Sequence, residues 1–250
     1  MISYFDLNTD RYPISCKLFL PEETEIKGAI LGVHGFAGDK ESTALSMLAG
    51  AANRQGIALI CFDFPAHGAS LATERELTVE NCMRDVLHMA DYMRSELPTV
   101  DRRIFATSFG GYIALLCADQ LADFSIVLRA PAVTMPEHIL TDILETTPDD
   151  FKRREIIECG FERKIKLPFS FYEDLQHHRV MDGDYHQQML IIHGDKDDVV
   201  PRKDILRFCG DHPTMRLVSI DGADHRFKNE GELERVVNVA MHFWSEKNGV

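Results

Sequence analysis

The sequence contains no pair of cysteines spaced as C-x-x-C, although six cysteines are distributed over its 250 residues. Each cysteine stands alone in an apolar segment, which argues against a zinc knuckle and against a disulfide framework. No apolar stretch approaches the roughly 18 residues that a transmembrane helix needs, and the opening residues MISYFDLNTD lack the features of a signal peptide. We therefore expect a cytoplasmic protein with buried thiols and no membrane partner.

Positive charge is also in short supply. The chain has 27 Lys and Arg against 40 Asp and Glu, which gives a formal net charge of -13 at pH 7. A chain of this charge repels a polyanion such as DNA or RNA, so we do not expect a nucleic-acid partner. The basic run at residues 152–154 is short, and we interpret it as a solvated helix face.

Repeats and low-complexity segments are absent as well, and strand and helix patterns alternate regularly along the chain. The expected strands are residues 2–7, 14–20, 27–33, 57–62, 103–106, 124–128, 189–193 and 215–220. The expected helices are residues 43–55, 79–97, 109–121, 202–209 and 231–247. This alternation predicts one α/β domain over residues 1–250, with a mostly parallel eight-stranded sheet and helices on both faces.

Residues 131–187 interrupt the alternation with short helical pieces, several prolines and many aromatic residues. A structureless loop of this length would be improbable in a compact domain. We therefore expect an inserted cap subdomain with its own small fold, lying over one end of the sheet. Most of its aromatic side chains would form its own core, and one of its edges could support a homodimer.

Residues 103–112, RIFATSFGGY, place a serine between an expected strand and an expected helix. In an open parallel sheet, functional groups gather at the carboxyl ends of the strands. A turn this tight would hold Ser108 in a strained conformation and would need small neighbours, which explains Ala106, Gly110 and Gly111. The hydroxyl would then project from the top of the sheet, although serine is also favoured as a plain helix N-cap.

A carboxylate and a histidine stand at the ends of the next two expected core strands. The segment HGDKDDVVP begins at the end of one strand, and DGADHRF follows the other. Serine, aspartate and histidine therefore occur in the order expected of a nucleophile, an acid and a base at strand ends. We predict Ser108 as the nucleophile and His225 as the base that accepts its proton.

Four segments resemble the α/β-hydrolase superfamily: HGF at 34–36, TSFGG at 107–111, HG-x-x-D-x-x-V-P at 193–201 and GADH at 222–225. The segments HGFAGDKES, FDFPAHGAS and RAPA further resemble small capped bacterial esterases of the cinnamoyl and feruloyl esterase type. Ala106 departs mildly from the first glycine of G-x-S-x-G. The resemblance implies the α/β-hydrolase fold and a serine hydrolase with no metal and no organic cofactor.

Three nearby aspartates compete for the role of the acid. Matching HG-x-x-D-x-x-V-P onto the chain implies Asp197, with Asp195 as the next candidate. The remaining aspartates are expected to close turns on their own backbone. The backbone N–H of Phe109, directly after the nucleophile, is one expected oxyanion donor. The resemblance points to the N–H of Phe36 as the other.

Other histidines invite functional interpretations that we do not favour. His34 and His67 are expected to hold their loops by hydrogen bonds. His177 and His178, together with His186, could suggest a metal site. Adjacent side chains on an extended segment point to opposite faces, however, so the pair makes a poor chelate.

We predict a serine hydrolase that cleaves carboxylic esters, short-chain or hydroxycinnamoyl, through an acyl-enzyme intermediate, with a small-molecule ester as its partner. A thioesterase, a monoacylglycerol lipase or a prolyl-oligopeptidase-like peptidase would use the same triad. A ligand receptor on the same fold is the alternative from a different class. A haloalkane dehalogenase is disfavoured because its nucleophile is an aspartate. For Arg129, at the end of an apolar strand, we favour an ion pair with an acidic residue over contact with an anionic substrate.

Overall fold

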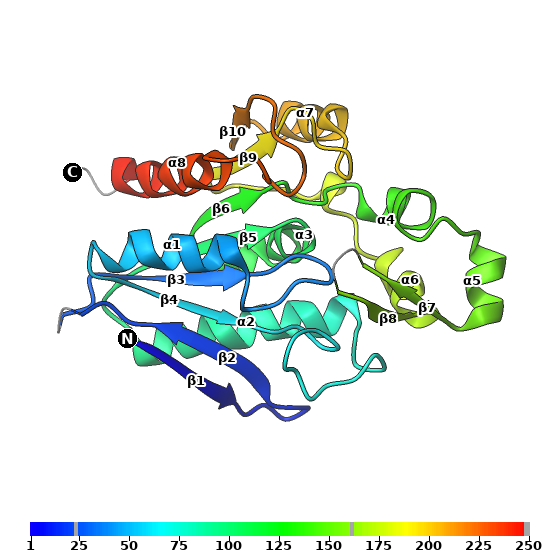
Figure 1. The fold of residues 1–250 in the computed structure, drawn as a ribbon, viewed down its shortest axis with the longest axis horizontal. Helices are drawn as coiled ribbons and strands as arrows, with labels where there is room; N and C mark the ends of the chain where they lie inside the picture. The colour runs from blue at the N-terminus through cyan, green and yellow to red at the C-terminus, as the bar shows by residue number, and fades with distance from the viewer. Residues whose placement is uncertain (23–24, 161–162, 248–250) are drawn as a thin grey trace.

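The main sheet has eight strands, and a computed structural model describes it within residues 1–22, 25–160 and 163–247 (Figure 1). Its strands are β1 (Ile2–Leu7), β2 (Ile14–Phe19), β3 (Gly28–Val33), β4 (Ile57–Phe62), β5 (Asp101–Thr107), β6 (Ser125–Arg129), β9 (Met189–Gly194) and β10 (Met215–Ile220). They lie in the order β1-β2-β4-β3-β5-β6-β9-β10. The first two strands run antiparallel to their neighbours, and the others are parallel. This confirms the predicted eight-stranded, mostly parallel sheet.

The order of the strands identifies where a ligand would bind. The chain passes from β3 outward to β4 and then returns to place β5 on the other side of β3. Strand order therefore reverses between β3 and β5. In open α/β sheets, ligands bind at such a switch point, beyond the carboxyl ends of the strands. The segments that leave β3 and β5 are those that carry Phe36 and Ser108.

Helices cover both faces of the sheet. On one face, α1 (Thr43–Asn53) and α8 (Glu232–Lys247) contact each other and enclose one apolar cluster. On the other face, a larger cluster lies beneath α2 (Val79–Glu96), α3 (Phe109–Leu116) and α7 (Arg202–Asp211). β3 and β4 are buried along their whole length, as expected for strands covered on both sides. None of the helices in the described ranges is long and apolar enough to cross a membrane.

The segment between β6 and β9 lies beyond the carboxyl ends of the parallel strands (Figure 1). It contains α4 (Met135–His138), a π-helical turn (Ile139–Ile143), α5 (Pro148–Arg154), β7 (Ile156–Cys159), β8 (Ile165–Pro168), α6 (Phe169–Leu175) and a 3-10 turn (Val180–Asp182). β7 and β8 form an antiparallel pair that the sequence pattern did not predict. Each of these strands has only four residues, too few to show an alternating pattern.

The helix after Ser108 is shorter than predicted. It ends at Leu116 instead of residue 121, and Ala118–Leu121 forms a 3-10 turn. The backbone N–H of Cys117 is directed at both Ile113 O and Leu115 O, which tightens the end of the helix.

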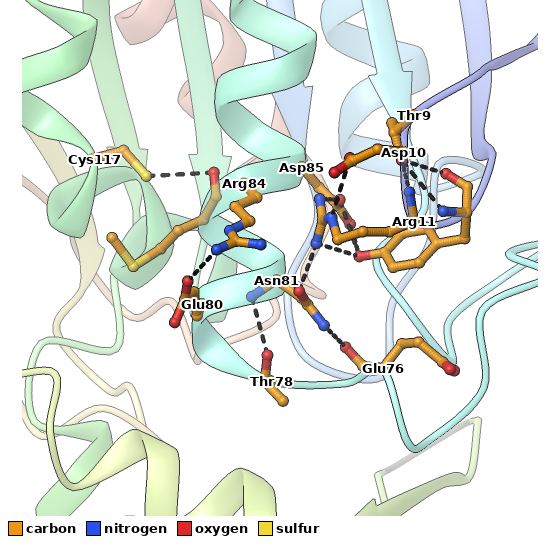
Figure 2. A network of polar contacts seen from close by, with 12 residues as sticks. Thr9, Asp10, Arg11, Glu76, Thr78, Glu80, Asn81, Arg84, Asp85 and Cys117 are labelled. Carbon is orange, nitrogen blue, oxygen red and sulfur yellow. Dashed lines mark hydrogen bonds and ion pairs between the residues drawn. The ribbon is translucent and has the colours of Figure 1, made fainter.

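A buried polar network ties the turn between β1 and β2 to α2 (Figure 2). Arg11 donates to Asn81 Oδ1 at 2.5 Å and to Asp85 Oδ1 at 3.0 Å, while the Tyr12 hydroxyl lies 2.9 Å from Asp85 Oδ2. The Asp85 side chain has no exposed surface. Burial raises the pKa of Asp85 to about 7, although Tyr12 and Arg11 act in the opposite direction.

Candidate active site

Ser108 occupies a sharp turn between β5 and α3. Its backbone has φ of 50° and ψ of -113°, a conformation that costs free energy for a non-glycine residue. A Cβ on Gly110 would lie 2.4 Å from His34 O, and one on Gly111 would lie 2.9 Å from Pro131 Cβ. The small residues after the serine are therefore required for α3 to approach β3 and the segment after β6.

His225 joins Ser108 to Asp197. The Nε2 atom of His225 lies 3.0 Å from Ser108 Oγ, and its Nδ1 atom lies 2.8 Å from Asp197 Oδ2. The imidazole is 12% exposed and the carboxylate is fully buried. The structure thus brings together three side chains, from the ends of β5, β9 and β10, that are separated by up to 117 positions in the sequence.

The carboxylate of Asp197 is held by several donors. The backbone N–H groups of Val199 and Val200 donate to its Oδ1 at 2.9 and 2.7 Å. His193 Nε2 lies 3.2 Å from its Oδ2. Burial alone would raise the pKa of Asp197, but hydrogen bonds from His193, His225 and Val200 outweigh it and hold the pKa well below its usual range.

His193 is a member of this site that the sequence interpretation missed. It is buried, and its Nε2 also lies 3.2 Å from Val200 O. The signal that could have identified it is its position as the first residue of HG-x-x-D, directly before the loop that carries Asp197.

Asp195, the alternative acid, has a different partner. Its Oδ1 accepts the backbone N–H of Gly222 at 2.6 Å, which joins the loop after β9 to the loop after β10. This contact differs from the expectation that the remaining aspartates close turns on their own backbone, because it joins two loops that are 27 positions apart in the sequence. The neighbouring Asp198 is exposed.

The loop after β3 passes close to the turn at Ser108 between β5 and α3, which we call the nucleophile elbow. A Cβ on Gly35 would lie 3.3 Å from Ser108 Cβ, and the rings of Phe36 and Phe109 pack edge to face at 5.7 Å. Phe109 is the first residue of α3, so its backbone N–H belongs to the unpaired N-terminal turn of the helix. The loop that carries Phe36 and the helix that begins at Phe109 therefore flank Ser108.

Two buried histidines hold this loop. The backbone N–H groups of Phe64 and Ala37 donate to the Nε2 atoms of His34 and His67, at 3.1 and 3.0 Å. The Nδ1 atoms then carry the protons and donate to Gly35 O and to Pro65 O, both at 2.7 Å. Burial lowers the pKa of both imidazoles, that of His67 to about 3. These contacts support the loop-holding roles expected for both residues.

A small cavity opens beside Ser108. Its walls come from the loop after β3, the start of α3, the segment after β6 and the loop after Asp197. The lining residues are Phe36, Ser108, Phe109, Ala132, Thr134, Met135, His138, Ile143, Val199 and Val200. The lining is mostly apolar. An apolar group would therefore be favoured here over a charged one.

One polar cluster stands among the apolar walls. Thr134 Oγ1 donates to Asp204 Oδ2 at 3.1 Å, and His138 Nε2 lies 3.1 Å from the same oxygen. His138 Nδ1 lies 2.9 Å from Asp142. The sequence interpretation missed this cluster because Asp204 is 66 positions from His138 and no local pattern relates the two residues.

Two of the histidines considered for a metal site have other partners. His178 Nδ1 lies 2.9 Å from Asp174 O, and His186 Nε2 lies 3.5 Å from Asp184. Within the described ranges, no group of three or more histidine, cysteine or carboxylate side chains could hold a metal ion.

Arg129 differs from the expectation. No ion pair joins it to a carboxylate within the described part of the chain, and its guanidinium lies over the ring of Phe227, 5.3 Å from the centroid. The sequence interpretation failed here because the loop that follows β10 brings an aromatic ring, and not an acid, against the end of β6.

Comparisons with known proteins identify a family and several similar structures. The family model described as serine aminopeptidase, S33, matches residues 24–154, and no curated protein matches the sequence. Est1E from Butyrivibrio proteoclasticus, solved with ferulic acid bound, has a TM-score of 0.86 and 24% identity, covering 98% of this chain and 100% of its own.

Two structures from eukaryotes are also similar. Alpha/beta hydrolase domain-containing protein 10 from mouse has a TM-score of 0.78 at 18% identity, covering 98% of this chain and 99% of its own. A soluble variant of monoglyceride lipase from Saccharomyces cerevisiae has a TM-score of 0.78 at 17% identity, covering 98% and 95%. At these identities the likeness shows the fold. Because the family model covers more than half of the chain, we conclude that this protein is a hydrolase of the serine aminopeptidase S33 family, with the α/β-hydrolase fold.

Proposed function

We propose that the chain hydrolyses carboxylic esters through an acyl-enzyme intermediate. Ser108 is the nucleophile, His225 is the general base and Asp197 is the acid that orients it. The observation that carries the proposal is the continuous line of contacts from Asp197 through His225 to Ser108, at 2.8 and 3.0 Å, beside an apolar cavity.

In the first step, Ser108 Oγ attacks the ester carbonyl and its proton passes to His225 Nε2. The tetrahedral intermediate expels the alcohol, which takes the proton from His225, and the acyl group remains on Ser108. Water then attacks the acyl-enzyme and gives its proton to His225. The second tetrahedral intermediate then collapses, which releases the carboxylic acid and returns the proton from His225 to Ser108.

Asp197 contributes through its charge and its position. As an ionised carboxylate it accepts a hydrogen bond from the Nδ1–H of His225, which leaves Nε2 unprotonated and able to accept the serine proton. The imidazolium that forms during each step lies directly against this buried negative charge. No step requires Asp197 itself to be protonated.

The oxyanion that forms on the substrate would be held by the backbone N–H groups of Phe109 and Phe36. The position of Phe109 at the start of α3 and the close approach of Gly35 to Ser108 support this assignment. Each such donor typically stabilises the transition state by about 3 kcal/mol.

The apolar lining of the cavity supports an apolar or aromatic acyl group. The polar cluster of Thr134, His138 and Asp204 suits an acyl group that carries a polar atom, as a hydroxycinnamoyl group does. The similar structure of Est1E was solved with ferulic acid, which is a hydroxycinnamate. These observations favour esters of apolar or hydroxycinnamoyl acids as substrates.

A substrate panel tests the proposal. Wild type and Ser108→Ala are compared on p-nitrophenyl acetate, butyrate and octanoate, methyl ferulate, an acyl thioester and a prolyl peptide amide. We expect turnover of ferulate or short-chain esters that falls by roughly 10³-fold or more in the variant. Preferred cleavage of the thioester or the amide would instead identify a thioesterase or a peptidase.

A fluorophosphonate titration separates the enzyme from a ligand receptor on the same fold. An enzyme is labelled stoichiometrically at Ser108. Failure of wild type both to hydrolyse any member of the panel and to be labelled would contradict the proposed function.

A further inference from the structure

Arg129 contacts the nucleophile elbow through its backbone. It is the last residue of β6, and its carbonyl accepts the backbone N–H of Ser108 at 2.9 Å. Ala132 N–H donates to Ser108 O at 3.1 Å, so the end of β6 and the segment directly after it hold both backbone groups of the serine. The main chain of Arg129 is therefore part of the support of the elbow.

The side chain of Arg129 reaches the other half of the site. Its guanidinium lies over the ring of Phe227, a buried residue with φ of 56° that follows His225 by two positions. A guanidinium and an aromatic ring at this distance attract each other, most strongly where water is excluded. The contact therefore fixes the loop after β10, on which His225 stands.

This arrangement is costly. The Nε atom of Arg129 is buried and has no hydrogen-bond partner within the described part of the chain. Burial lowers the pKa of Arg129 to about 10, and the negative charges of Asp197 and Asp224 only partly oppose this. An apolar side chain would fill the same space without an unsatisfied donor.

We propose that Arg129 is a positioning residue that holds the His225 loop against the Ser108 elbow. The inference rests on the proposed function, because it assigns a role in the alignment of the same side chains. One residue touches the elbow through its carbonyl and the histidine loop through its guanidinium, so it sets the distance between Ser108 Oγ and His225 Nε2. Its positive charge also lies in the field of Asp197, the partner of His225.

Arg129→Met tests the proposal, because it keeps the backbone contact with Ser108 and removes only the guanidinium. Two readouts are used: the second-order rate of labelling by a fluorophosphonate, and the low-field proton resonance of the His225–Asp197 hydrogen bond. We expect the labelling rate to fall about 10-fold or more, since small misplacements of reacting groups are costly. We expect the resonance to broaden or shift. Arg129→Lys, which keeps the charge, should restore at least part of the rate.

Arg103→Met is the matched control. Arg103 also lies over an aromatic ring, 5.5 Å from the centroid of Trp244. It stands near the amino end of β5, whereas Ser108 follows the carboxyl end of that strand. We expect it to keep the wild-type labelling rate and resonance. Phe227→Leu removes the ring and keeps the arginine, and we expect it to reproduce the Arg129→Met result. It takes the place of Arg129→Met if that variant does not fold.

The proposal is overturned if Arg129→Met, or Phe227→Leu in its place, retains the wild-type labelling rate within twofold and keeps the resonance. It is also overturned if the control loses as much rate as the Arg129 variant. Should wild type fail to react with the phosphonate, the proposed function fails, and the resonance alone then decides whether Arg129 positions His225.

Discussion

At the scale of single residues, Asp197 and Asp195 stand two positions apart and do different work. Asp197 is buried, and its oxygens face His225, His193 and two backbone N–H groups. The side chain of Asp195 accepts the backbone N–H of Gly222 in the loop after β10. The direction in which each carboxylate leaves the loop, and not its distance from His225 in sequence, decides which one can orient the imidazole.

Asp197→Asn and Asp195→Asn form a matched pair. An amide at position 197 can donate to His225 and so favour the wrong tautomer, and we expect kcat/KM to fall by about 10³- to 10⁴-fold. An amide oxygen at position 195 can still accept the N–H of Gly222, and we expect a loss of about threefold at most. Steady-state hydrolysis of p-nitrophenyl butyrate measures both. The larger loss in the Asp195 variant would reverse the assignment.

Asp85 makes the stability of the protein depend on pH. Its pKa is raised to about 7 in the folded state, whereas an exposed aspartate titrates near 4. A carboxylate with a raised folded-state pKa costs stability as the pH rises through the interval between the two values. The free energy of unfolding should therefore fall by about 2 to 3 kcal/mol from this group between pH 5 and pH 8.

Urea unfolding of wild type and Asp85→Asn at these two pH values measures the effect. The variant cannot titrate at this position, so its stability should change less over the same interval. Equal changes in the two proteins would show that Asp85 is ionised throughout and that Arg11 and Tyr12 outweigh its burial.

At the scale of elements, the close packing of α3 on the end of β3 depends on a missing side chain. A Cβ on Gly110 would meet His34 O at 2.4 Å and Val33 Cγ1 at 2.9 Å, whereas a Cβ on Gly210 in α7 meets nothing within 4 Å. Substitution of these two glycines by alanine therefore compares a position with no room for a Cβ atom with a position that has room for one.

Gly110→Ala should destabilise the protein by about 2 to 3 kcal/mol and displace the elbow, because backbone atoms cannot move aside as a flexible side chain does. Gly210→Ala should be neutral or stabilise by up to about 1 kcal/mol. Thermal unfolding and esterase rates of both variants provide the comparison. A Gly110 variant as stable and as active as wild type would show that α3 can shift without disturbing Ser108.

The main sheet could be predicted because each strand carries its own signal. β3 and β9 are continuous apolar runs bounded by turn residues, and both were placed to within one residue. The end of α3 could not be placed, since residues 117–121 remain apolar enough to continue a helix. β7 and β8 are short, exposed on one side and stabilised by each other, so their pairing follows from the tertiary arrangement.

The candidate site also has a part that the sequence could predict and a part that it could not. Ser108, Asp197 and His225 were selected because each follows a recognisable strand within a recognisable motif. The Thr134–His138–Asp204 cluster and the contact of Arg129 with Phe227 join residues that no motif relates. Such contacts depend on how loops pack, which the local sequence pattern does not encode.

At the scale of the whole molecule, one apolar cluster extends from the sheet into the segment between β6 and β9. Phe109 beneath the sheet end and Phe171 on α6 have ring centroids 5.9 Å apart, and Phe36 contacts both rings. Phe151 and Leu175 belong to the same cluster as the core beneath α2 and α3. The segment therefore shares its core with the main sheet.

A shared core predicts shared unfolding. Differential scanning calorimetry should show one transition, with a calorimetric enthalpy close to the van't Hoff enthalpy. Limited proteolysis within residues 131–187 should be slow until that transition begins, because local opening would expose the common cluster. An early separate transition that retained the signal of the sheet would show that the segment folds as an independent unit.

Val199 and Val200 have two roles that depend on different parts of each residue. Their backbone N–H groups hold Asp197, while their side chains line the cavity beside Ser108. A substitution there changes the shape of the cavity and leaves the amide groups in place. If the proposed ester hydrolysis holds, mutation at these positions, and at Met135 and Ile143, changes which acyl group fits best in the cavity. A lineage with this architecture can explore new substrates while its chemistry is inherited intact.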